Sequence, residues 1–244
     1  MATAIGIGSS SFIKEKKKIT PIDSSCSSIA VWGFYGHKKI NRLAVFTLPK
    51  GMFTFYKKHI EFITDHAVDP DKRRYAVEVE APRHYIDIDH YHHDSLTPFQ
   101  LVPRDWNDAI TKFTEDTLQE YGIVPWHVNF MQYRLTKAFK EKDLKKILKL
   151  SAEIGHYIGD ASVPLHTTEN YNGQLTGQRG IHGFWESRIP ELFSEDYDFF
   201  VGQATYIESP IDYIWDVVES SHIAVDSVLG FEKDLTNTYP KDRK

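Results

Sequence analysis

The spacing of apolar residues indicates a helical chain. Over much of the sequence these residues recur at intervals of three and four, which places them on one face of an α-helix. The pattern predicts one helix around residues 40–48 and another around residues 56–63, with Pro49-Lys50-Gly51 as the break between them. It also predicts helices over three later ranges, 106–121, 125–140 and 142–159.

Residues 69–105 interrupt this pattern. Prolines predict a long irregular crossing there, at Pro70, Pro82, Pro98 and Pro103. Within it, only Tyr75 to Glu80 and Tyr85 to Ile88 show the alternation typical of strands. Later in the chain, the glycine-rich range 172–180 predicts a loop that leads into a helix near His182. We therefore expect an all-α fold, a single-domain multi-helix bundle with long functional loops.

Composition and charge limit the size and the partners of this bundle. A chain of 244 residues that is 41 % hydrophobic can bury a full core, and we expect one domain. It has no apolar run of 18 residues, so no bilayer-spanning segment is predicted. The formal net charge of −5 does not favour binding of a polyanion by overall attraction, so any bound phosphate must be held locally.

The first 30 residues differ from the rest of the chain. They combine small residues, a basic cluster at residues 14–18 and a serine-rich stretch. As a secretory signal the region is poor, because the charged cluster follows the weakly apolar segment instead of preceding it. We expect residues 1–31 to be a leader or a disordered tail, and residues 32–244 to form the functional domain.

Histidines and carboxylates provide the candidate chemistry. Cys26 is the only cysteine, so a metal would have to be held by His, Asp, Glu or backbone groups. His156 and Asp160 are one helical turn apart, so both side chains can reach one ion. Pro164 then ends the helix and lets His166 approach from the loop side.

His182 and Glu186 repeat the four-residue spacing of His156 and Asp160. Either pair alone would most simply be a surface ion pair. The repetition, and the apolar neighbours of His156, favour a metal site instead, because a carboxylate buried without a cation is costly. Two helices that each present a His and a carboxylate are a known way to build a multi-metal site in a bundle.

Two upstream motifs extend this pattern. Trp32-Gly33-Phe34-Tyr35-Gly36-His37 opens the folded part, and Asp69 is followed fifteen residues later by His84. In this order, with His-x-x-x-Asp, Pro-Leu-His and His-x-x-x-Glu after them, the chain from Trp32 to Glu186 resembles the trinuclear zinc nucleases of the S-one/P-one type. It is equally similar to their relatives, the bacterial zinc-dependent phospholipases C.

The resemblance implies three zinc ions and a ligand set. One zinc would be bound by Asp69, His84, His156 and Asp160, and a second by His166, His182 and Glu186. The third would take His37, Asp160 as a bridge, and the amino and carbonyl groups of Trp32. An amino ligand requires Trp32 to be the mature N-terminus; otherwise Trp32 would hold the ion by its carbonyl alone.

Asp69 is preferred to Asp71 because its interval to His84 fits the resemblance. The counterpart of this residue in the superfamily can also accept a proton from the attacking water, so Asp69 is the one candidate catalytic residue. Among the other histidines, the cluster at residues 90–93 is expected to line the rim of the site or a solvated loop. His127 is expected in the core or behind the ligands.

The implied activity is zinc-dependent hydrolysis of a phosphate ester by an activated hydroxide. The first expectation is a nuclease acting on single-stranded DNA or RNA. The alternative is a phospholipase C acting on phospholipid head groups, with Phe99, Leu101 and Val102 around its mouth. Glu186 resembles the phospholipases, whereas Trp185 and the tight Trp-Gly-x-x-Gly-His spacing resemble the nucleases.

A third interpretation, from another class, is a metal-binding protein that keeps the scaffold without activity. The resemblance also implies a secreted or periplasmic protein. No stable protein partner is implied, so we expect a monomer whose partner is its substrate.

Overall fold

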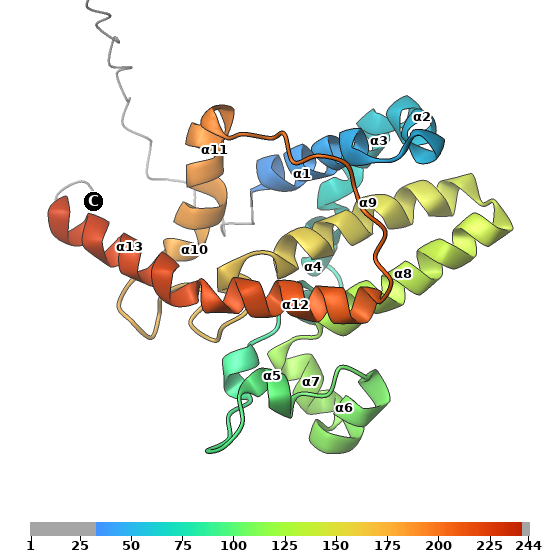
Figure 1. Cartoon of the computed structure of the whole chain (residues 1–244). Helices are drawn as coiled ribbons and strands as arrows, with labels where there is room; N and C mark the ends of the chain where they lie inside the picture. Colours follow the sequence, from blue (N-terminus) through green and yellow to red (C-terminus); the bar gives the residue numbers. More distant parts are fainter. Residues whose placement is uncertain (1–32, 241–244) are drawn as a thin grey trace, which may run out of the picture.

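Helices form the framework of residues 33–240, the part of the chain that the computed structural model describes (Figure 1). The α-helices are α1 (Phe34–Thr47), α2 (Lys50–Lys58), α3 (Ile60–Asp65), α4 (Asp69–Arg74), α5 (Pro98–Leu101), α6 (Trp106–Phe113), α7 (Glu115–Tyr121), α8 (Val124–Glu141), α9 (Leu144–Ala161), α10 (Ile181–Gly183), α11 (Ile189–Phe193), α12 (Pro210–Ile223) and α13 (Val225–Thr238). The 3₁₀ helices are η1 (His66–Val68), η2 (Glu78–His84), η3 (Ile88–His90), η4 (Pro164–His166) and η6 (Ser194–Asp196), and η5 (Phe184–Arg188) is a π-helix. The all-α prediction is confirmed. Trp32 and the domain boundary predicted at residue 31 lie outside the described residues.

Helices α8 and α9 form an antiparallel pair at the centre of the bundle, and α12 packs against both (Figure 1). The pair can turn sharply because Lys142 adopts a left-handed conformation with φ 55° and the Asp143 side chain caps the start of α9. Edge-to-face aromatic contacts fill the core on this side, with the rings of Trp126 and Trp215 5.1 Å apart. The predicted helices at 125–140 and 142–159 correspond to α8 and α9.

Two glycines let α1 approach α9 closely. A Cβ atom on Gly155 would lie 2.2 Å from Asn41 Oδ1, and one on Gly159 would lie 3.3 Å from His37 Nδ1. The Asn41 amide donates to the carbonyl of Ala152 at 2.9 Å, which anchors α1 on α9. The absence of side chains at these two positions therefore places His37 directly against the helix that carries His156.

The proline-rich crossing folds into short helices instead of the two predicted strands. Residues 75–80 form a turn and the start of η2, and no strand occurs within residues 33–240. Residues 85–87 form no regular element and Ile88 begins η3, while the backbone binds separate segments: Ile86 N donates to His166 O, and Asp87 N donates to Tyr121 O. The strand prediction was wrong because the alternation reflects burial of Ile86 and Ile88 in the core, without a neighbouring strand.

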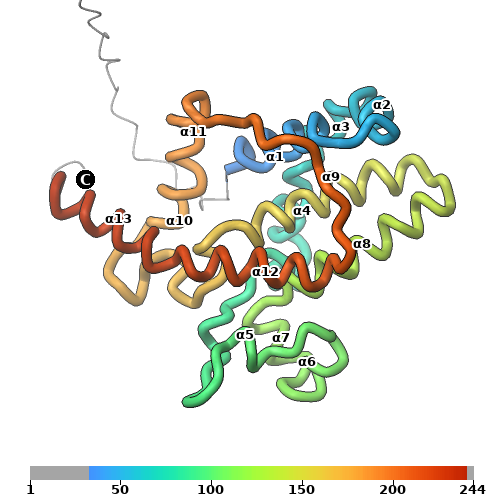
Figure 2. Tube along the Cα trace, viewed as in Figure 1, coloured from blue at the N-terminus to red at the C-terminus, as the bar shows by residue number. Residues whose placement is uncertain are grey.

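The C-terminal region contains two helices, and Trp215 and His222 both lie on the first of them, α12. In Figure 2 the segment 197–209 runs beside α1 before α12 begins, and Ala204 N donates to Thr47 O at 2.8 Å. None of the described helices is long and apolar enough to cross a membrane.

Candidate metal centre

Imidazoles and carboxylates from seven elements converge in the interior of the bundle. α1 contributes His37, α4 contributes Asp71 and η2 ends with His84, while α9 contributes both His156 and Asp160. The turns after α9 add three more, His166 from η4, His182 from α10 and Glu186 from η5. Apart from His182, all of these residues are buried.

A first group of four residues, called the first site, contains Asp71, His84, His156 and Asp160. Asp160 Oδ2 lies 2.8 Å from His84 Nδ1 and 3.2 Å from His156 Nε2, and these two nitrogens are 3.1 Å apart. Two ligands at about 2.0 Å from a tetrahedral zinc lie about 3.3 Å from one another. The three atoms therefore already have nearly the separation that one zinc requires.

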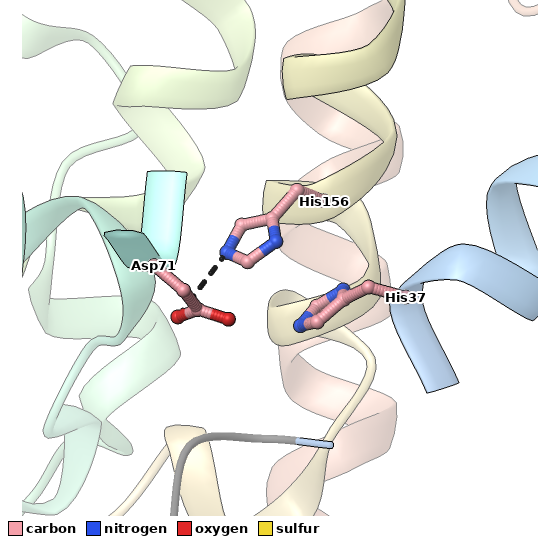
Figure 3. A group of neighbouring side chains, drawn as sticks. All are labelled: His37, Asp71 and His156. Atoms are coloured by element: carbon pink, nitrogen blue, oxygen red, sulfur yellow. Dashed lines mark ion pairs between the residues drawn. The ribbon is translucent and has the colours of Figure 1, made fainter. Parts of the chain in front are cut away.

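Asp71, and not Asp69, faces this group. Asp71 is 2 % exposed, and its Oδ1 lies 3.7 Å from His156 Nε2 and 3.8 Å from His84 Nδ1 (Figure 3). The Asp69 side chain is 32 % exposed and pairs with His66 at 2.6 Å and Lys72 at 3.0 Å. Both residues lie on α4, and side chains two positions apart on an α-helix point in directions that differ by about 200° around the helix axis. The interval that favoured Asp69 thus selected the outward-facing carboxylate.

A second group, called the second site, contains His166, His182 and Glu186. Glu186 Oε2 lies 3.1 Å from His182 Nε2 and 3.4 Å from His166 Nε2. Glu186 belongs to the π-helix η5, a rare geometry that is frequent at functional sites. This site is less enclosed than the first, since the His182 side chain is 19 % exposed.

His37 and Asp160 form the third site. His37 Nε2 lies 3.3 Å from Asp160 Oδ1, the oxygen opposite the one that faces the first site. The His37 ring stacks on that of His156, with centroids 3.8 Å apart (Figure 3). The structure therefore brings together seven of the nine predicted ligands; Asp69 lies outside the centre, and Trp32 lies outside the described residues.

Backbone carbonyls fix the orientation of three imidazoles. His156 Nδ1 donates to Ala67 O at 2.9 Å, His166 Nδ1 to His84 O at 2.6 Å, and His182 Nδ1 to Tyr171 O at 3.2 Å. Each Nδ1 therefore carries a proton, and each Nε2 faces a neighbouring carboxylate, so that its lone pair would be available to a cation held between them. This is the arrangement found around metal-bound histidines.

The carboxylates show why a cation fits here. Within the described residues, three buried carboxylate oxygens have no hydrogen-bond partner: Asp71 Oδ2, Asp160 Oδ1 and Glu186 Oε1. A buried carboxylate with an unsatisfied oxygen is costly unless a cation compensates for it. Oxygen and imidazole donors at these separations suit zinc, and an incomplete protein ligand set leaves room for water, as in catalytic zinc sites.

Comparison with known protein families agrees with this geometry. The family model described as zinc-dependent phospholipase C matches residues 36–240. The chain belongs to this family. No curated protein and no solved structure matches the chain. Membership makes the protein a zinc-dependent hydrolase of phosphate esters and confirms the superfamily expected from the sequence.

The charges in this phospholipase-type centre are strongly coupled. Burial alone would raise the pKa of Asp160, but His156 and His166 outweigh it and hold the pKa well below its usual range. Burial would lower the pKa of His166, but Glu186 and Asp160 raise it to about 10. Burial raises the pKa of Asp71 to about 6. The centre thus attracts positive charge as a whole.

The remaining histidines have structural roles. The His90 ring stacks on Tyr121, with centroids 3.2 Å apart, and His92 Nδ1 donates to the carbonyl of His90. His127 is buried with its ring against Tyr157 at 4.5 Å, as expected for a residue of the core. Sequence reasoning weighed Asp71 against Asp69 and preferred Asp69 by its interval to His84, whereas the structure turns Asp71 toward the first site.

Proposed function

We propose that this member of the family is a phospholipase C that hydrolyses the phosphodiester of a phospholipid head group at three zinc ions. The observation that supports it is the family match over most of the chain, combined with three groups of His and carboxylate side chains within the described residues, each close enough together to hold a metal ion. The family match favours this reading over the nuclease that the Trp-Gly-x-x-Gly-His spacing placed first. The convergence of these mostly buried donors also argues against an inactive scaffold.

In this proposal the first site binds zinc through Asp71, His84, His156 and Asp160, and the second through His166, His182 and Glu186. Bound zinc would supply Lewis acidity and lower the pKa of a coordinated water to about 7. Asp160 aligns the sites, because its Oδ2 faces His84 and His156 while its Oδ1 faces His37 at 3.3 Å and His166 Nδ1 at 4.0 Å. Asp69 is assigned no role in catalysis, since its carboxylate is held by Lys72 and His66.

Exposed apolar side chains near His182 are suited to the lipid substrate. Tyr171 and Phe184 are both exposed, the Tyr171 ring lies 6.0 Å from that of His182, and Phe184 follows His182 by two residues. The apolar mouth predicted at Phe99, Leu101 and Val102 is not supported, because these residues pack in or against the core beside Trp215. We place the substrate entrance on the side of the second site.

The third site requires a further ligand, and we propose that it is Trp32. Cleavage after Val31 would free the Trp32 amine to join His37 and Asp160. Export of the protein as a secreted or periplasmic enzyme would supply the processing step. N-terminal sequencing of protein from its native cells tests this: a chain that begins at another residue would leave Trp32 only its carbonyl as ligand.

The decisive experiment combines metal content with substrate choice. Protein beginning at Trp32 is analysed by mass spectrometry for zinc and assayed on phosphatidylcholine, single-stranded DNA and RNA. We expect three zinc ions per chain and release of a phosphorylated head group from the lipid. Turnover of nucleic acid alone would replace the phospholipase with the nuclease, and protein that binds no zinc would refute both.

A further inference from the structure

A network of charged side chains lies behind His84, outside the ligand set. Its centre is Glu80, a residue of η2 that is 1 % exposed. Oε1 of Glu80 accepts hydrogen bonds from Tyr157 Oη and from Arg73 Nη2, the latter at 3.0 Å, and its Oε2 accepts from Arg83 Nη1 at 2.7 Å. Burial would raise the pKa of Glu80, but Tyr157 and Arg73 outweigh it and lower the pKa. The carboxylate is therefore charged although it is buried.

His84 is oriented differently from the three histidines that backbone carbonyls hold. Its Nδ1 faces the first site, 2.8 Å from Asp160 Oδ2, so its Nε2 must carry the proton when Nδ1 binds zinc. That Nε2 is buried and has no hydrogen-bond partner among the described residues. The carboxylate that faces it is Glu80, whose Oε1 lies 3.9 Å away.

We propose that Glu80 is a positioning residue that holds the Nε2 proton of His84 and so directs Nδ1 to the first zinc. This rests on the ligand role of His84 in the proposed function. A carboxylate in this place fixes the tautomer and raises the basicity of the ligand, the function that carboxylates perform behind many metal-bound histidines. The 3.9 Å between Glu80 Oε1 and His84 Nε2 is too long for a hydrogen bond, but across a buried, low-dielectric space the negative charge of Glu80 still attracts an N–H at that nitrogen.

Arg73 extends this role from one ligand to the whole first site. From α4, which carries Asp71, it reaches Glu80 on η2 at 3.0 Å and Glu153 on α9 at 2.6 Å. It also donates to Tyr157 Oη on α9 at 3.1 Å. The three elements that supply the first site are thus tied together by one guanidinium and the Glu80 carboxylate.

The chain offers a matched control in Glu153. It is also a buried glutamate that pairs with Arg73, and its other ion pair is with Lys149 at 3.9 Å. It forms no ion pair with any of the four first-site residues within the described chain. Glu80→Gln and Glu153→Gln therefore remove the same charge from the same arginine, but only the former removes the charge that faces His84.

The test measures zinc affinity by competition with a chelator, and the stability of the metal-free protein by urea unfolding. We expect Glu80→Gln to weaken one of the bound zinc ions by about 10- to 100-fold. The zinc affinity of Glu153→Gln should stay within about threefold of that of the unsubstituted protein. The loss of metal-free stability should be larger in Glu80→Gln, because Glu80 accepts hydrogen bonds from Tyr157, Arg73 and Arg83, whereas Glu153 accepts one from Arg73. Unchanged zinc affinity in Glu80→Gln, or an equal loss in Glu153→Gln, would overturn the proposal.

Two further readouts separate this inference from the assigned activity. If Glu80→Gln does not fold, Glu80→Asp is the alternative, because its shorter side chain keeps the charge but moves it away from His84. This variant should lose part of the zinc affinity. An affinity equal to that of the unsubstituted chain would count against the inference. Because affinity is measured without substrate, a protein that proves inactive on lipids but shows the difference between Glu80→Gln and Glu153→Gln would refute the activity and keep the positioning role.

Discussion

The first-site ligands come from α4, η2 and α9, whereas the second-site ligands come from short turns that follow α9. The first group lies against the large core, where His156 and Asp160 are carried by an 18-residue helix. The second group rests on a small cluster of apolar residues: Val163, Leu165, Ile181 and Val228. Its histidine at position 182 belongs to a helix of three residues.

This contrast shows two ways of holding a ligand. In the first site, helix packing fixes the side chains before any metal binds, as in the stacking of His37 on His156. In the second, the loop between Thr167 and Gly180 has to be held in place by its own hydrogen bonds, such as that from Thr168 Oγ1 to Asp89 at 2.6 Å. We expect the second site to depend more on zinc for its order, and the following predictions test that difference.

Asp160→Asn should have the largest effect, because the Asp160 carboxylate faces residues of the first, second and third sites. Substitution weakens a carboxylate that lies within 3.3 Å of His37, His84 and His156. We expect loss of more than one zinc and at least about a 100-fold fall in phosphodiester hydrolysis. The metal-free variant should be less stable than the metal-free parent, because Asp160 pairs with His156 at 3.2 Å and His37 at 3.3 Å, and removing one partner of a buried ion pair is destabilising. A variant that keeps its full zinc content by mass spectrometry would contradict the bridging role.

Removal of zinc by a chelator should loosen the second site more than the first. Amides in residues 167–188 should exchange with deuterium about tenfold faster or more, because few apolar contacts hold this segment without metal. Amides in residues 150–160 should change much less, since α9 is packed between α1, α8 and α12. Hydrogen exchange followed by mass spectrometry compares both segments in one sample. Equal acceleration would mean that the two sites open together.

The helices and most of the ligands could be predicted from sequence because both depend on local spacing. His156 with Asp160 and His182 with Glu186 are four residues apart, so the pairing follows from one helical turn. The choice between Asp69 and Asp71 could not be made from local spacing. Which of the two carboxylates points toward the first site depends on how the short helix α4 packs on η1 and η2. The role of Glu80 could not be predicted either, because its donors Arg73 and Tyr157 lie 7 and 77 residues away in the chain.

A pair of substitutions on α4 sharpens the description of the first site. Asp71→Asn should weaken one zinc by about 10-fold or more, because its carboxylate faces His84 and His156. Asp69→Asn should leave zinc content and activity unchanged and cost less than about 1 kcal/mol of stability, since its ion pairs are partly exposed. Zinc titrations and urea unfolding measure both. A loss of zinc in Asp69→Asn alone would restore the interval-based assignment.

The smallest expected effect concerns the approach of α1 to α9, which positions His37. In Gly155→Ala the added Cβ would lie 2.2 Å from Asn41 Oδ1, so either the Asn41 side chain gives up its place against α9 or α1 moves outward, at a cost of about 1–3 kcal/mol. Gly230→Ala is the control: it lies on α13 with open space around it, and alanine there should stabilise the protein by up to about 1 kcal/mol. Since His37 and Asn41 share one face of α1, Gly155→Ala should also weaken the zinc at the third site before it affects the other two. A loss of stability with all three zinc affinities unchanged would show that the position of His37 against α9 does not depend on Asn41.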